Sequence, residues 1–217
     1  MSDINQICTK YGGTVTWGFS QSSFGIWKRL LFNKYTRMGI CAGLVSHWIK
    51  YHSDGSSLAA KLGGGGAGQL NEVKLNEIAT LHASVSHDSD QQTVWLNQWL
   101  KMHGIFPLFA NQKYPTTPFR NIEHSLTSEV RGLNDAYAKL SFGGTAFFSR
   151  AAHAVGVWGA GNGSEVLYFD PNHGEFWFPS CSSFNRFFIE YFRCKYLSKG
   201  ISFNEYYKVI AYRKGGN

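Results

Sequence analysis

The sequence predicts an α+β fold, with helices in the first half of the chain and an antiparallel sheet in the second. Two patterns support this fold class: apolar residues at helical spacing in the first half, and short aromatic and β-branched runs between turns in the second. Of the 217 residues, 43% are hydrophobic and 16% are aromatic, a composition that excludes a disordered chain. At this length we expect a single domain over residues 1–217.

Helices account for the first half. A stripe of apolar residues at intervals of three or four predicts an amphipathic helix over residues 40–51. The stripe consists of Cys41, Leu44, Val45, Trp48 and Ile49. Similar signals predict helices over 93–104 and 119–132. The glycine run at 62–69 lacks the Lys-Ser/Thr pair of a phosphate loop, so we expect a connector there.

Strands dominate the second half, where short runs rich in aromatic and β-branched residues are separated by turn residues. These runs are GTAFFSR (144–150), HAVGVWGA (153–160), EVLYFDPN (165–172), GEFWFP (174–179) and YYKVIAYRK (206–214). Between the last two, residues 182–199 carry aromatic side chains at helical spacing. That spacing predicts a helix that packs on the sheet.

The net charge and the spacing of the cysteines limit the partners and cofactors that we expect for this chain. The chain has 21 Lys and Arg against 14 Asp and Glu, a formal net charge of +7. These basic residues are scattered, so we expect no nucleic-acid partner. The four cysteines show no C-x-x-C spacing, so we expect thiols, no metal and no cofactor. Neither a long apolar run nor a cleaved secretory signal is recognisable, so we expect no transmembrane segment and export without a cleaved Sec signal.

Cys41 has two interpretations. At the edge of an apolar stripe, a cysteine is commonly a packing residue. At the N-terminus of a helix, the macrodipole and the unpaired N–H groups favour the thiolate, which is the nucleophilic form. Gly39 would keep the approach to such a thiol open. The residues alone leave both interpretations open, and a nucleophile also requires a base.

His153 is the preferred candidate for that base. His47 and His52 share the predicted helix of Cys41 and lie too far along it to reach the thiol. His153 opens a predicted strand and Asp170 ends the next one, so antiparallel pairing makes them cross-strand neighbours. A carboxylate in that position holds the imidazole in the tautomer that a base needs. His173 is the rival, although it lies too near Asp170 in sequence for a strand to separate them.

Three stretches resemble a known family: GICAGLVSHWI, HAVGVWG and YFDPNHGEFWF. They resemble the motif blocks of the YopT/AvrPphB family of papain-like cysteine proteases, virulence effectors that bacteria deliver into plant or animal cells. The most specific element is Asp-Pro-Asn-x-Gly-Glu-Phe at 170–176. The resemblance implies a papain-like cysteine protease fold, with the nucleophile on an N-terminal helix packed against a C-terminal antiparallel sheet. It also implies that Cys41 is the nucleophile, His153 the general base and Asp170 the orienting acid.

The resemblance does not assign the side chain that stabilises the oxyanion. Papain-like enzymes place a Gln or Asn a few residues before the nucleophile, whereas this chain reads NKYTRMGIC. Thr36 and Arg37 occupy the nearest positions, and Asn33 lies farther back. The backbone N–H of Cys41 would supply one hydrogen bond in any case.

Three functional hypotheses follow. The first is a cysteine endopeptidase with a Cys-His-Asp triad, a secreted bacterial effector or toxin that cleaves a specific protein in the cytosol of a host or target cell. Its expected partners are that protein and a secretion chaperone or delivery machinery, and its basic charge favours a neutral or acidic substrate segment. The second is a peptidoglycan amidase effector, in which the same three residues cleave the peptide bonds of the bacterial cell wall. The third is a basic binding module in which Cys41 is a core residue.

Overall fold

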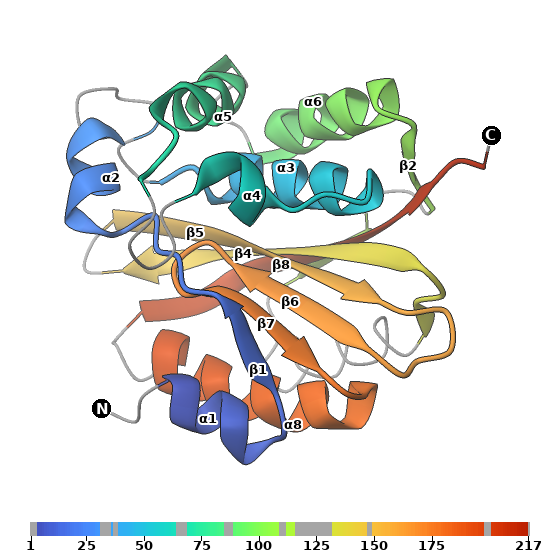
Figure 1. Ribbon diagram of the computed structural model, residues 1–217. Coiled ribbons are helices and arrows are strands. Elements are labelled where there is room, and N and C mark those ends of the chain that lie inside the picture. The colour runs from blue at the N-terminus through green and yellow to red at the C-terminus, as the bar shows by residue number, and fades with distance from the viewer. Residues whose placement is uncertain are drawn as a thin grey trace.

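The elements form three layers, with a large twisted antiparallel sheet between two layers of helices (Figure 1). The structure is a computed structural model. It describes residues 4–30, 36, 39–63, 69–84, 89–108, 112–115, 132–146, 149–197 and 201–216. This arrangement confirms the predicted α+β class, because the helices of the first half cover a sheet built largely from the second half.

Helices cover both faces of the sheet. The first layer contains α2 (Phe24–Leu30), α3 (Cys41–Ser53), α4 (Leu58–Leu62), α5 (Glu72–Ser84) and α6 (Ser89–Met102). The layer on the opposite face contains α1 (Ile4–Lys10) and α8 (Cys181–Phe192), which continues into the π-helical turn η1 (Arg193–Leu197). None of the described helices is long and apolar enough to cross a bilayer.

The sheet has the strand order β1-β7-β6-β5-β4-β8-β2, and β3 also pairs with β8. Its strands are β1 (Thr14–Trp17), β2 (Ile105–Pro107), β3 (Gln112–Pro115), β4 (Ala136–Ala146), β5 (Ser149–Gly159), β6 (Val166–Asp170), β7 (Gly174–Phe178) and β8 (Ile201–Lys214). Every described pair is antiparallel. The strands β5, β6 and β7 follow one another as neighbours, so short turns connect the centre of the sheet.

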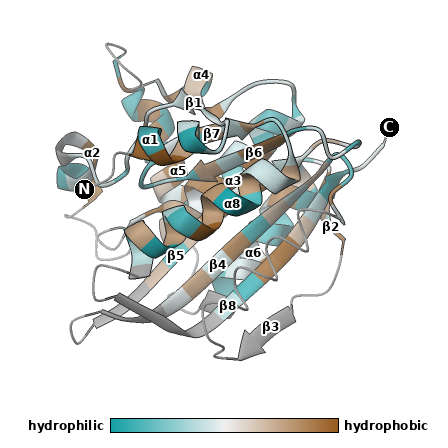
Figure 2. Ribbon diagram, turned by 90° about the horizontal axis from the view of Figure 1, so that it is seen from below, coloured by the Kyte–Doolittle hydropathy of each residue, from teal (hydrophilic) through white to brown (hydrophobic). Residues whose placement is uncertain are grey.

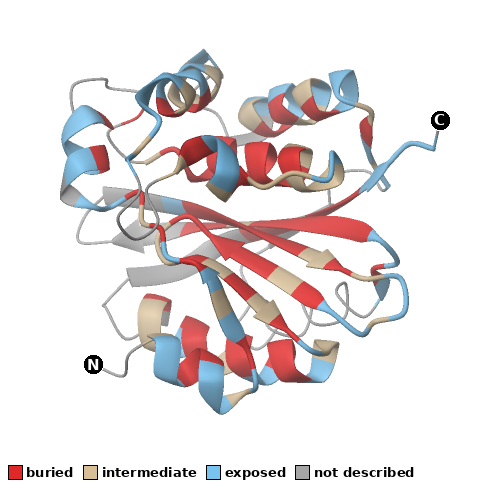
Figure 3. Cartoon of the chain, viewed as in Figure 1, coloured by how far each residue is buried: buried red, intermediate tan, exposed pale blue. Residues whose placement is uncertain are grey.

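Each face of the sheet has its own apolar cluster. Alternation along β5 separates the clusters, since Val155 and Val157 belong to the α8 side and Ala154 packs on the α3 side. Figure 2 looks onto the α8 side, where this helix lies over the sheet. Its apolar contribution is aromatic, from Phe184, Phe187, Phe188, Tyr191 and Phe192. Figure 3 shows that α3 and the central strands are largely buried, while α2 and α6 present exposed surfaces.

The helix α3 is the central helix of its layer. Ten of its 13 residues are buried, because the sheet covers one side and other helices cover the rest. Close approach to the sheet is possible at Gly156 of β5, where a Cβ would lie 2.9 Å from the Trp48 ring. The indole Nε1–H of Trp48 donates to Glu175 Oε2 at 2.6 Å. This contact assigns a structural role to the glutamate of the Gly-Glu-Phe motif.

The structure confirms some of the predicted helices and strands and corrects the bounds of others. The helix over 40–51 is confirmed as α3, and the helix over 93–104 is confirmed as α6, which begins earlier, at Ser89. The run at 144–150 was wrong as a single strand, because β4 ends at Ala146 and β5 begins at Ser149. The helix predicted over 182–199 ends as an α-helix at Phe192 and widens into the π-helical turn η1. Most of the stretches predicted at 62–69 and 119–132 lie outside the described residues.

Gly174 tests the tight connection between β6 and β7. Its φ is +108°, and a Cβ would lie 2.2 Å from the carbonyl oxygen of Trp17. We expect Gly174→Ala to lower the free energy of unfolding by about 3 kcal/mol or more, because strained backbone and a steric clash add. Chemical denaturation of both proteins measures the difference.

The matched control is Gly163→Ala. Gly163 also has a positive φ, +68°, but a Cβ there would meet nothing within 4 Å. We expect a loss of only about 1 kcal/mol from backbone strain. Equal losses in the two variants would contradict the steric argument for Gly174.

Candidate active site

Cys41 is the first residue of α3, as the sequence predicted. The preceding residue, Ile40, is the N-cap and has no polar side chain, so the N-terminus of this helix lacks a side-chain cap. The thiol therefore lies at the positive end of the macrodipole. Cys41 is 9% exposed, which combines packing against the α3 cluster with access from the surface.

Gly39 turns the chain into this helix. Its φ is +104°, in the region that favours glycine. A Cβ at this position would also lie 3.2 Å from Gln21 Oε1. Glycine is therefore required before α3, both by the backbone conformation and by the neighbouring Gln21 side chain.

His153 and Asp170 form a buried pair. The Nε2–H of His153 donates to Asp170 Oδ1 at 2.9 Å, since a carboxylate can only accept. The two side chains are 5% and 0% exposed. The side chain of Cys41 lies close enough to the imidazole to raise the pKa of His153. The three residues predicted from the sequence are thus brought together.

The strand geometry behind this pair differs from the prediction. His153 lies inside β5, which begins at Ser149, so the expectation that it opens a strand was wrong. The paired residues of β5 and β6 end at Gly156 and Phe169. Continuing that register puts Asp170 opposite Val155 rather than His153. The two side chains meet diagonally on the same face of the sheet.

The carboxylate of Asp170 accepts several hydrogen bonds besides the one from His153. Its Oδ1 also accepts from the N–H of Asn172 at 2.8 Å. Its Oδ2 accepts from three hydroxyl groups, those of Tyr196 at 2.5 Å, Tyr191 at 2.7 Å and Tyr168 at 3.3 Å. Each bond favours the ionised form of the acid.

Burial and charge act in opposite directions on the pair. Burial alone would raise the pKa of Asp170, but the charge and hydrogen bond of His153 hold this pKa well below its usual range. Burial alone would lower the pKa of His153, but the charge and hydrogen bond of Asp170, together with the side chain of Cys41, raise this pKa above its ordinary value. The pair is therefore an imidazolium and a carboxylate, and the imidazolium faces the thiol.

Other histidines have structural roles. His47 Nδ1 hydrogen-bonds the carbonyl of Gly43, and burial lowers the pKa of His47 to about 4. His52 Nδ1 hydrogen-bonds the hydroxyl of Tyr137. His173, the rival base, lies in the turn after Asp170, where its backbone N–H donates to the Asp170 carbonyl. Its ring packs edge-on against Tyr191.

The sequence analysis missed Gln21. Its side-chain oxygen accepts from the N–H of Ile40 at 2.9 Å, and its amide nitrogen donates to Asn172 Oδ1 at 2.9 Å. Papain-like enzymes carry their oxyanion-stabilising amide just before the nucleophile, whereas Gln21 lies on the segment between β1 and α2. Thr36, one of the residues considered, is buried and donates its hydroxyl to the carbonyl of Leu30. Asn33 and Arg37 lie outside the described residues.

Lys139 is a buried cation near the candidate nucleophile. It lies on β4, is 2% exposed, and its Nζ is 5.7 Å from the centre of the Tyr212 ring. Burial and the neighbouring Lys208 lower the pKa of Lys139 to about 8, while a thiolate at Cys41 acts in the opposite direction. The surroundings of the thiol are therefore electropositive on the sheet side as well.

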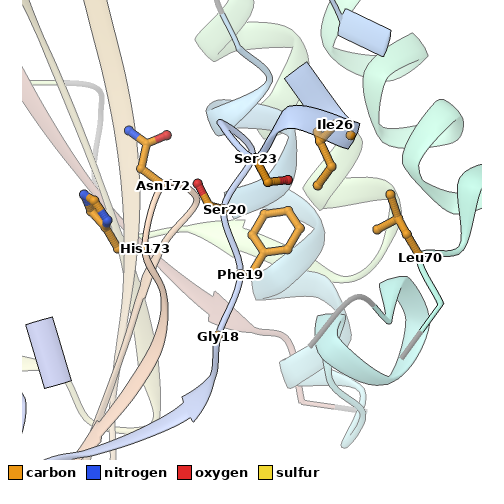
Figure 4. A pocket seen from close by; sticks show the side chains of 9 residues that line it. Gly18, Phe19, Ser20, Ser23, Ile26, Leu70, Asn172 and His173 are labelled. Carbon is orange, nitrogen blue, oxygen red and sulfur yellow. The ribbon is translucent and has the colours of Figure 1, made fainter. Parts of the chain in front are cut away.

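A pocket of about 590 Å³ adjoins the turn after Asp170. Figure 4 shows the segment around Phe19 between that turn and Leu70. The described lining has no carboxylate, lysine or arginine; it consists of Gly18, Phe19, Ser20, Ser23, Gly25, Ile26, Leu70, Asn172 and His173. Such a lining suits an apolar or neutral side chain.

Comparison with known proteins agrees with the geometry. A family model described as Yersinia/Haemophilus virulence surface antigen matches residues 5–206. Cysteine protease YopT of Yersinia pestis is 27% identical over 201 residues, which is 87% of this chain and 61% of YopT. The protein adenylyltransferase and cysteine protease IbpA of Histophilus somni is 26% identical over 222 residues, 94% of this chain and 5% of IbpA. The chain thus spans about three-fifths of YopT.

One solved structure supports the fold. The crystal structure of the Pseudomonas avirulence protein AvrPphB matches with a TM-score of 0.55, over 80% of this chain and 90% of AvrPphB, at 19% identity. This likeness confirms the predicted papain-like arrangement of helices on an antiparallel sheet. Because the family model also covers nearly the whole sequence, the chain belongs to the Yersinia/Haemophilus virulence surface antigen family, the family of YopT and AvrPphB.

Proposed function

We propose that this chain is a cysteine endopeptidase that cleaves a protein of a target cell, with Cys41 as nucleophile, His153 as acid and base, and Asp170 as orienting acid. The observation that carries the proposal is the buried His153, which is hydrogen-bonded to Asp170 and lies close to Cys41 at the N-terminus of α3. A nucleophile, a base and an orienting group within hydrogen-bond reach are the requirements for covalent catalysis.

The reaction proceeds in two halves. The thiolate of Cys41 attacks the carbonyl carbon of the scissile peptide bond, and the N–H of Cys41 stabilises the negative oxygen. The C–N bond then breaks as the His153 imidazolium gives its proton to the leaving amine, which leaves a thioester. Water attacks the thioester, His153 takes its proton, and the C–S bond breaks to release the acid and restore the thiolate.

The names of the relatives support the wider setting of the proposal. YopT and IbpA are both named cysteine proteases, and the family description refers to virulence. We therefore propose a secreted bacterial effector that acts inside a host or target cell, with a secretion chaperone or delivery machinery as a further partner. The pocket beside Asn172 and His173 suits a side chain of the protein substrate.

Replacement of Cys41 tests the nucleophile. We expect Cys41→Ala to lower kcat/KM about a thousandfold or more, because triad members act as a unit. The melting temperature should change little, since one sulfur atom at the rim of a cluster is removed. Cleavage assays on a protein substrate and thermal melts measure the two effects.

Selective alkylation provides the control for Cys41. Iodoacetamide should label Cys41 far faster than Cys8, because burial raises the pKa of Cys8 to about 11. Cys181→Ala, at the start of α8, should retain full activity. Equal labelling of Cys8 and Cys41 by mass spectrometry would contradict the assignment.

Replacement of His153 tests the base against its rival. We expect His153→Ala to be as inactive as Cys41→Ala, because no other described side chain both bonds Asp170 Oδ1 and reaches the thiol. The matched controls are His47→Ala, which should retain most of the activity, and His173→Ala, which should retain most of kcat and change mainly KM, because His173 lines the pocket. Comparable loss in either control would require reassignment of the base.

The pH profile tests the ion pair. The ordinary pKa of a histidine is 6.5, and Asp170 raises the pKa of His153 above this value. His153 therefore loses its proton only above pH 6.5. The alkaline limb of kcat/KM should therefore lie above pH 6.5. In Asp170→Asn the raising charge is absent, so this limb should move to lower pH. A limb that stays in place in the variant would argue against the pair.

Substrate charge is the last test of the proposed function. With a formal net charge of +7, the chain should cut neutral or acidic peptide segments faster than polybasic ones, because like charges slow encounter. Added salt should reduce the preference for acidic segments by screening. A peptide library assayed at low and high ionic strength measures both effects, and efficient cutting of a polybasic segment would reject the charge argument alone.

A further inference from the structure

Gln21 connects two parts of the site that are far apart in the sequence. It lies on the segment between β1 and α2 and is 6% exposed. Its backbone N–H donates to the carbonyl of Pro171 at 2.8 Å. Its side chain accepts from the N–H of Ile40 and donates to Asn172 Oδ1. One residue thus contacts the entry to the nucleophile helix and the turn that follows the acid.

The chemistry of the two partners fixes the orientation of the Gln21 amide. A backbone N–H can only donate, so the group that faces Ile40 must be the side-chain oxygen. The nitrogen then faces Asn172 Oδ1, which accepts it. Asn172 in turn donates its backbone N–H to Asp170 and its side-chain Nδ2 to Tyr196. The hydrogen bonds therefore run without interruption from Ile40 to the carboxylate.

The local backbone is adapted to this bridge. Gly39 has no side chain to displace the Gln21 amide, which lies within 3.4 Å of the position that a Cβ would occupy. Ile40 offers α3 no side-chain cap, so Gln21 supplies the polar contact at this end of the helix. The residue after Ile40 is Cys41, and a shift of the helix start would move the thiol away from His153.

We propose that Gln21 is a positioning residue for the reaction: its amide joins the start of α3 to the Asn172 turn and so fixes Cys41 relative to His153 and Asp170. This inference rests on the proposed function. Loss of the bridge should slow the chemical step and lower the reactivity of the Cys41 thiol. It should leave substrate affinity nearly unchanged.

The test compares Gln21→Met with the unchanged chain. Methionine preserves the length of the side chain and removes both hydrogen bonds. We expect kcat to fall about tenfold with KM changed less than about twofold, because misplacement of a reacting group by about 1 Å costs up to ~100-fold. Alkylation of Cys41 by iodoacetamide should slow by a similar factor, with the rate at Cys194 unchanged.

Ser22→Ala is the matched control. The Ser22 hydroxyl donates to the same acceptor, Asn172 Oδ1, at 3.3 Å, but it makes no described contact with Ile40. The control should retain the kcat and alkylation rate of the unchanged chain. Where Gln21→Met does not fold, Gln21→Glu is measured instead, since a carboxylate still accepts from Ile40 and cannot donate to Asn172.

A double-variant cycle with Asn172→Ala separates a bridge from two independent bonds. If Gln21 acts through Asn172, the double variant Gln21→Met, Asn172→Ala should be no slower than the slower single variant by more than about twofold. Multiplicative losses would overturn the bridge.

The alkylation rate keeps this inference separate from the proposed function. A chain that cleaves no peptide, but in which Gln21→Met slows the alkylation of Cys41, would retain the positioning role and reject the peptidase. Conversely, unchanged kcat and unchanged alkylation in Gln21→Met would overturn the positioning role and leave the peptidase standing. A loss equal to that of Ser22→Ala would also overturn it.

Discussion

The hydrogen-bonded ion pair of His153 and Asp170 constrains the structure around it. Both side chains are almost completely buried, and a buried charge is costly unless it is paired and hydrogen-bonded. Asp170 meets this requirement with an imidazolium, a backbone N–H and three tyrosine hydroxyls. Removing His153 would leave the carboxylate without its counter-charge, which is why the pair is expected to behave as a unit.

The position of α3 is the second constraint, because it brings the thiol to that pair. The helix lies directly on Gly156, and the indole of Trp48 is anchored by Glu175. Gly174 allows β7 to begin immediately after the turn that carries Asn172. The residues of the Gly-Glu-Phe motif thus have packing roles, whereas the Asp of the preceding motif belongs to the site itself.

Local patterns in the sequence predict much of this arrangement. The apolar stripe of α3 and the aromatic runs of β5 to β8 are periodic, and periodicity survives folding because it reflects which face is buried. The Cys, His and Asp residues were identified through short motifs that the chain keeps intact. Helices such as α5 were missed because only Leu75 and Ile78 are buried there, which leaves a weak pattern.

Contacts between segments that are far apart in the sequence could not be predicted from local patterns. No local signal relates Gln21 to Ile40, since the segment around Gln21 contains no regular element and the bond forms only when α3 docks. The hydroxyls of Tyr191 and Tyr196 were equally hidden, because at helical spacing an aromatic residue indicates packing and says nothing about its polar end. The position of His153 within β5 was misjudged because the β4–β5 connection carries no glycine or proline.

The tyrosines around Asp170 make the α8 side of the sheet part of the candidate active site. Tyr191 belongs to α8 and Tyr196 to the π-helical turn, and both hydroxyls hold the oxygen of Asp170 that His153 does not use. A change in the orientation of α8 would therefore also change the hydrogen bonds that Asp170 accepts. A chain shortened before Tyr196 would keep all three motif blocks intact and still lose part of the shell that keeps its acid ionised.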